Sequence, residues 1–199
     1  MDLDQNAVLR RYATAVDAAH GELTRLDRHS GDGDFGDNLR AGLRAAAARH
    51  DRTGGPAFAV LGEVFLDEVG GTSGPLFGLL FTEIARALAA DPGAFASGAA
   101  AGLGAIRRVG EAEIGDRTLV DALAPAVDAL HGPRPFAAAA RAAADGAART
   151  AGLRARRGRA SYLGDRALGA ADPGAAGIAL LFWAVASVAE PDDDVPPPF

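Results

Sequence analysis

Apolar residues recur along most of the chain at intervals of three and four positions, the spacing that places side chains on one face of an α-helix. Short segments rich in glycine, proline and aspartate separate eight such stretches, and no segment shows a convincing strand pattern. The alanine-rich composition, with few aromatic residues, also favours helix. The pattern predicts helices over residues of about 4–26, 39–50, 58–69, 76–88, 92–110, 118–130, 134–147 and 173–188.

Eight helices joined by short connections predict an all-α fold, an up-and-down antiparallel barrel or bundle. In that arrangement alternate connections lie at the same end. The connections near residues 27–38, 71–74, 110–118 and 159–174 are alternate ones, so we expect all four to meet at one rim.

We expect one domain over residues 1–189 and an acidic, proline-rich tail over 190–199, which is loosely attached. The absence of cysteine excludes disulfides and thiolate metal sites. An acidic start and no apolar run of roughly 18 residues predict a cytoplasmic protein without a membrane partner. The net charge of −6 argues against nucleic acid as a binding partner. All 20 basic residues are Arg, which excludes a Walker A lysine and Schiff-base chemistry.

The densest chemistry lies in residues 26–38, where four carboxylates and three glycines alternate. Such glycines let the backbone turn tightly and aim Asp32 and Asp34 at one point. Carboxylate oxygens without Cys favour Mg²⁺ or Ca²⁺. Ordinary Asp-Gly turns are the competing interpretation. An EF-hand is excluded because its sixth and twelfth positions hold Asp37 and Leu43 instead of Gly and Glu.

Three further segments carry polar chemistry, and each has a plainer alternative. A Gly-Thr-Ser-Gly-Pro turn over 71–75 opens a helix, which suits a phosphate but also an ordinary helix cap. The loop over 115–121 contains Asp and Thr residues that could bind a ligand or only cap the next helix. The arginines of 154–159 could hold an anion or lie solvated. At one rim, carboxylates, Mg²⁺ and a phosphate site together indicate nucleotide binding and phosphoryl transfer.

Six motifs, in the same order, resemble the L subunit of dihydroxyacetone kinase over essentially the whole chain. They are Leu26-Asp27, Gly31-Asp32-Gly33-Asp34, Gly71-Thr72-Ser73-Gly74-Pro75-Leu76, Gly115-Asp116-Arg117-Thr118, Gly158-Arg159-Ala160-Ser161-Tyr162-Leu163-Gly164 and Asp172-Pro173-Gly174. The resemblance implies an eight-helix barrel that holds ADP or ATP through two Mg²⁺ at one rim. Two positions depart from the family: Phe35 stands where His is frequent, and Arg117 where Lys is usual.

The resemblance also implies roles for individual residues. Asp27, Asp32 and Asp34 match the metal ligands. The positions that match the nucleotide site are Phe35, Gly36, Asp37, Asn38, Gly71, Thr72, Ser73, Gly110, Thr118, Leu119, Arg166, Asp172, Pro173 and Gly174.

In this family the ketone substrate is held on a histidine of a separate K subunit. None of the four histidines here lies in such a motif, so the resemblance implies a phosphotransferase that acts only with a K-type partner on dihydroxyacetone or a related small ketose. The phosphoryl donor is either exchanging ATP or a phosphotransferase-system protein that rephosphorylates a retained ADP. The alternatives are a regulatory module that docks on a transcription regulator, the related domain of a fatty-acid kinase, which belongs to a larger chain, and a structural Mg²⁺ site.

Overall fold

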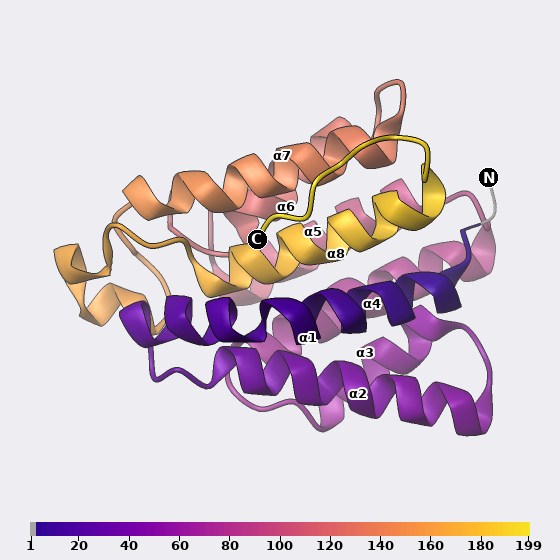
Figure 1. Cartoon of the computed structure of the whole chain (residues 1–199), viewed down its shortest axis with the longest axis horizontal. Coiled ribbons are helices and arrows are strands. Elements are labelled where there is room, and N and C mark those ends of the chain that lie inside the picture. The colour runs from indigo at the N-terminus through magenta and orange to yellow at the C-terminus, as the bar shows by residue number, and fades with distance from the viewer. Residues whose placement is uncertain (1–2) are drawn as a thin grey trace.

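The computed structural model describes residues 3–199, and within that range it contains helices and no strand. Eight α-helices follow one another along the chain (Figure 1). They are α1 (Gln5–Ser30), α2 (Phe35–Thr53), α3 (Ala57–Asp67), α4 (Ser73–Ala90), α5 (Phe95–Gly110), α6 (Val120–Ala129), α7 (Pro135–Arg149) and α8 (Pro173–Ala189). Three short 3₁₀ helices, η1 (Thr150–Gly152), η2 (Arg159–Tyr162) and η3 (Gly164–Ala167), lie between α7 and α8.

Each helix packs against its neighbours in the chain, and α8 returns to pack along α1. The eight helices therefore form a closed ring, which confirms the predicted all-α up-and-down barrel. Helix α8 also contacts α2 and α6, and it is apolar and buried along most of its length. Its carbonyl at Gly177 accepts a hydrogen bond of 3.0 Å from the buried Tyr12 hydroxyl of α1, which ties the last helix to the first.

Aromatic side chains fill the middle of the ring. Phe65 of α3 and Phe81 of α4 meet edge to face with ring centroids 5.1 Å apart, and Phe95 of α5 meets Phe182 of α8 at 6.1 Å. Such pairs contribute roughly 0.5–1.5 kcal/mol each beyond the burial of their surface. Glycines allow close approach elsewhere: a Cβ at Gly98 would lie 2.6 Å from the Cα of Ile84. This packing holds the helix ends, and with them the loops, in fixed positions.

Several helix boundaries differ from those expected. Helix α1 runs to Ser30, so Asp27 lies in its last turn and not in a loop. Helix α2 begins at Phe35, which places Asn38 inside the first turn and not at the N-cap position. The reason is that the Asp27 carboxylate accepts the backbone N–H of Phe35 and so replaces a cap. Helix α5 starts at Phe95, after a turn closed by Asp91.

The tail after α8 is attached, contrary to the expectation from its composition. It runs back along α7 and α8 (Figure 1). The indole Nε1 of Trp183 donates to the carbonyl of Val195 at 2.9 Å, and the Glu190 carboxylate accepts the backbone N–H of Ala137 in the first turn of α7 at 2.8 Å.

None of the helices in residues 3–199 combines the length and the apolar character that crossing a bilayer requires.

Candidate functional site

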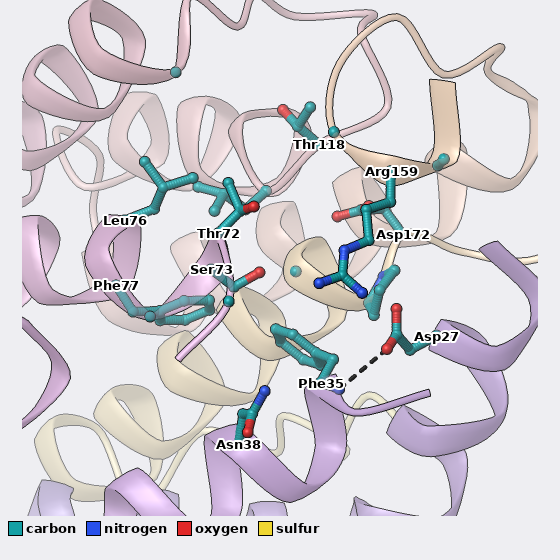
Figure 2. Close-up of a pocket in the computed structure, with 18 of the residues that line it drawn as sticks. Asp27, Phe35, Asn38, Thr72, Ser73, Leu76, Phe77, Thr118, Arg159 and Asp172 are labelled. Carbon is teal, nitrogen blue, oxygen red and sulfur yellow. Dashed lines mark hydrogen bonds between the residues drawn. The ribbon is translucent and has the colours of Figure 1, made fainter. Parts of the chain in front are cut away.

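A cavity of about 180 Å³ lies at one end of the barrel, and all four of the alternate connections line it. This confirms the expectation that these connections share a rim. Figure 2 shows Asp27, Arg159 and Asp172 on one side of the cavity and Thr72, Ser73 and Leu76 on the other. The predicted site residues that line it are Asp27, Asp32, Asp34, Phe35, Asn38, Gly71, Thr72, Ser73, Gly110, Thr118, Leu119, Asp172, Pro173 and Gly174.

Three residues that the resemblance assigned to the nucleotide do not line this cavity. Gly36 faces α1, where a Cβ would lie 2.7 Å from the Thr24 hydroxyl, so it serves helix packing. Asp37 is exposed and accepts a hydrogen bond of 2.9 Å from His20, which lowers the pKa of its carboxyl. Arg166 lies exposed in η3. The structure therefore places none of these three residues in the cavity lining.

Asp27 is the anchor of the carboxylate cluster. It is buried, with 8% of its surface exposed, and its Oδ2 accepts the backbone N–H groups of Gly33 at 2.9 Å and Phe35 at 3.0 Å (Figure 2). Hydrogen bonds to an ionised acceptor are stronger than neutral ones, and they fix the 31–34 turn against the end of α1. Both hydrogen bonds use Oδ2, so they hold the carboxylate in one orientation and do not involve Oδ1.

The carboxylates of Asp27, near the end of α1, and of Asp32 and Asp34, in the turn after it, converge. One carboxylate oxygen from each of Asp27, Asp32 and Asp34 lies within 4.8 Å of the others. Asp32 also forms an ion pair with Arg159 of η2, so a cation already sits against one carboxylate. All three donors are hard oxygens, the ligands that Mg²⁺ prefers. The donor set and its convergence fit a divalent cation, and nucleotide phosphates supply the further oxygens that Mg²⁺ takes when bound to such sites.

Opposite the carboxylates, helix α4 points its N-terminus at the cavity. Neither Thr72, at its N-cap position, nor any other side chain caps this end of the helix through a hydrogen bond within the described residues. The first backbone N–H groups and the positive end of the helix dipole therefore face the cavity beside the Thr72 and Ser73 hydroxyls. This is an arrangement that favours an anion such as a phosphate.

The rest of the lining is mainly apolar. Leu76 of α4, Ile106 of α5 and Leu119 before α6 contribute side chains beside the backbone of Gly110. These side chains offer an apolar surface to a planar, weakly polar group. The cavity therefore has a carboxylate-rich side and an apolar side.

Asp172 and Arg117 place two charged groups in the wall between these sides. Burial raises the pKa of Asp172 to about 6; the N–H of Ala175 and the charge of Arg117 oppose this, while Asp121 and Asp27 add to it. Burial likewise lowers the pKa of Arg117, and Asp172 opposes that shift. The Asp172 carboxylate accepts the N–H of Ala175 at 2.8 Å and so caps α8.

Arg159 and Arg117 line the cavity but were not among the predicted site residues. Arg159 stands in the basic cluster of 154–159, for which the sequence left open an anion site or a solvated run. Gly158, with φ +67°, turns the chain directly before Arg159, which forms the ion pair with Asp32. The signal in the sequence was the glycine directly before Arg159.

Comparison with known proteins places the chain in a family. The DAK2 domain family matches residues 29–187, which include most of the cavity. The chain belongs to this family. Its DAK2 domain is similar to two bacterial proteins named as ADP-binding subunits DhaL of PEP-dependent dihydroxyacetone kinases. The one from Escherichia coli is 36% identical, over 84% of this chain and 88% of that protein. The one from Listeria innocua is 36% identical, over 82% of this chain and 84% of that protein.

Other relatives are longer. The L-erythrulose 1-kinase of Mycolicibacterium smegmatis is 39% identical over 90% of this chain but only 34% of its own length. The crystal structure of the dihydroxyacetone kinase from C. freundii in complex with AMP-PNP and Mg²⁺ superposes with a TM-score of 0.77 at 31% identity, covering 92% of this chain and 33% of that chain. This DAK2 domain thus spans about a third of these relatives and most of the DhaL subunits.

Proposed function

We propose that this chain is the nucleotide-binding component of a small-ketose kinase. Asp27, Asp32 and Asp34 hold two Mg²⁺ ions, and these bind the phosphates of ADP or ATP. The observation that carries the proposal is the convergence of three carboxylates within 4.8 Å on a cavity whose opposite wall is the uncapped N-terminus of α4. The names of the similar DhaL subunits and the AMP-PNP and Mg²⁺ of the similar C. freundii structure support it.

Each wall has a task in this proposal. The Mg²⁺ ions neutralise the phosphate and carboxylate charges, which otherwise repel. The N–H groups and hydroxyls at Thr72 and Ser73 orient the phosphates, and Arg159 adds a positive charge beside Asp32. Leu76 and Leu119 pack against the base. Positioning and electrostatic stabilisation of this kind account for most of the catalysis in phosphoryl transfer.

The acceptor substrate, dihydroxyacetone or a related small ketose, is held by a separate K-type subunit. Exposed apolar side chains in the segments that line the cavity support such a partner. Val109, Ile114 and Tyr162 stand in the segments that line the cavity and expose 66%, 63% and 88% of their surfaces. Large exposed apolar side chains in the segments that line a charged cavity support a surface that another protein covers.

Calorimetric titration of the metal-stripped protein with ADP tests the nucleotide part. We expect binding only with Mg²⁺, and its loss in Asp32→Asn. Asp128→Asn is the matched control because Asp128 is exposed at the far end of α6. Binding of ADP that is equal with and without Mg²⁺, or unchanged in Asp32→Asn, would refute the proposal.

The donor and the partner are tested next. With a K-type subunit added, the chain transfers phosphate to dihydroxyacetone. Ile114→Arg lowers the rate at a subsaturating concentration of the K-type subunit without changing ADP affinity.

ADP that dissociates within seconds identifies exchanging ATP as the phosphoryl donor. ADP that stays bound through gel filtration, and is rephosphorylated only by a phosphotransferase-system protein, identifies the other donor.

A further inference from the structure

Arg117 is the one large charged side chain in the described part of the barrel that is almost wholly buried. Only 1% of its surface is exposed, and it lines the cavity from the loop before α6. Its backbone has φ +61°, a left-handed conformation that side chains other than glycine rarely adopt. Neither feature stabilises the fold, because each raises the free energy of the folded state.

The hydrogen bonds of Arg117 are incomplete. Its Nη2 donates to the carbonyl of Ala170 at 2.9 Å, while its Nε and Nη1 are buried without a partner among the described residues. Buried donors left unpaired destabilise a protein, and an apolar side chain of similar size would avoid the penalty. Strained and under-bonded groups of this kind concentrate at functional sites. The hydrogen bond that Arg117 does form, to the carbonyl of Ala170, is therefore the contact on which a function depends.

That contact joins two segments of the cavity wall. Ala170 precedes the Asp172-Pro173-Gly174 turn that opens α8, and Leu119 follows Arg117 at the start of α6. The two segments touch directly, since a Cβ at Gly174 would lie 3.3 Å from the Cβ of Leu119. The loop that carries Arg117 is itself rigid, because the Asp121 carboxylate accepts the N–H groups of Gly115 and Thr118 at 2.5 and 2.8 Å.

We propose that Arg117 is a positioning residue of the nucleotide site. Its bond to Ala170 and its charge opposite Asp172 hold the 170–174 segment against Leu119, and this fixes the wall on which the nucleotide lies. The inference rests on the proposed function. Arg117 touches the wall and acts on the nucleotide through it. A lysine supplies a charge and one donor, which is all that the observed contact uses.

Two variants separate this role from a general loss of stability. Arg117→Met removes the charge and the donor, and Arg117→Lys restores both. The matched control is Arg156→Met: Arg156 also contacts this loop, through an ion pair of 3.5 Å with Asp116, but its side chain is 70% exposed. Arg117→Gln, whose shorter side chain does not reach Ala170, replaces the Met variant if that variant does not fold.

Calorimetry with ADP and Mg²⁺ gives the first measurement. Because displacement of a site wall by about 1 Å weakens function by up to ~100-fold, we expect Arg117→Met to lose on the order of 10- to 100-fold in ADP affinity. Arg117→Lys recovers most of the loss, and Arg156→Met stays near wild type. Wild-type affinity in a folded Arg117→Met protein, or a Lys variant as weak as the Met variant, would overturn the proposal.

Amide hydrogen exchange of the nucleotide-free protein gives the second measurement. Exchange over residues 168–176 should become faster in Arg117→Met and return in Arg117→Lys, while exchange in α2 and α3 stays unchanged. Unchanged exchange at 168–176 in the Met variant would refute the positioning role. This experiment needs no ligand, so a wild-type protein that failed to bind ADP would count against the proposed function alone.

Discussion

The Asp27 carboxylate depends on the absence of a side chain at Gly31. A Cβ at Gly31 would lie 2.3 Å from Asp27 Oδ1, closer than real Cβ atoms approach, and 3.2 Å from its Cγ. Gly31→Ala must therefore push the carboxylate away from the N–H groups of Gly33 and Phe35, which it accepts at 2.9 and 3.0 Å. Hydrogen bonds to charged groups contribute about 1.5–3 kcal/mol each, so weakening both should lower the free energy of unfolding by about 2 kcal/mol.

Thermal unfolding and ADP titration measure the two consequences of Gly31→Ala. A loss of about 2 kcal/mol lowers the melting temperature by roughly 4–8 °C in a domain of this size. Displaced Asp27 also weakens Mg²⁺-dependent ADP binding, on the order of 10- to 100-fold. Gly21→Ala is the control in the same helix: Gly21 is exposed with nothing within 4 Å of a Cβ, so alanine should stabilise by about 0.8–1 kcal/mol. Gly31→Ala protein that melts and binds ADP like wild type would refute the reasoning.

Three further substitutions follow from other contacts. Burial raises the pKa of Asp172 from 3.8 to about 6, so its contribution to stability is fully present below pH 4 and is lost as the pH rises through 6. In chemical denaturation without metal, Asp172→Asn should therefore match wild type near pH 4 and exceed it by about 1–2 kcal/mol at pH 8, because partial exposure reduces the full effect. Arg159→Ala removes an exposed ion pair with Asp32, so its melting temperature should stay near wild type while calorimetry shows ADP bound several-fold more weakly. Glu190→Ala removes the acceptor for Ala137 and should lower the free energy of unfolding by about 1 kcal/mol, with ADP affinity unchanged.

Periodicity predicted the barrel because its cause is local: a helix with one apolar face must bury that face. The order of the helices then placed Asp27, Thr72, Thr118 and Asp172 at the same rim without any knowledge of tertiary contacts. The carboxylate-rich turn could also be predicted, because the alternation of glycine and aspartate that forms it involves only neighbouring residues.

The features that the sequence did not reveal depend on distant partners. Asp27 replaces the cap of α2 across the turn, so Asn38 is not needed at the N-cap position. The ion pair of Arg159 with Asp32 was not foreseen, because the path of the segment that carries Arg159 depends on how it packs against the barrel. The tail looked loose from its prolines, yet Trp183 and the first turn of α7 supply donors for it.

The return of α8 to α1 has a consequence for synthesis of the protein. Within this domain, the aspartates of the turn after α1 are synthesised before most of the helices, whereas Asp172-Pro173-Gly174 and the helix that closes the ring are synthesised after α7. A nascent chain that lacks α8 leaves the apolar faces of α1 and α7 uncovered and has no complete cavity. The proposed nucleotide cavity is thus complete only after α8 has been made, and ribosome-bound intermediates without α8 expose apolar surface of the kind that chaperones bind.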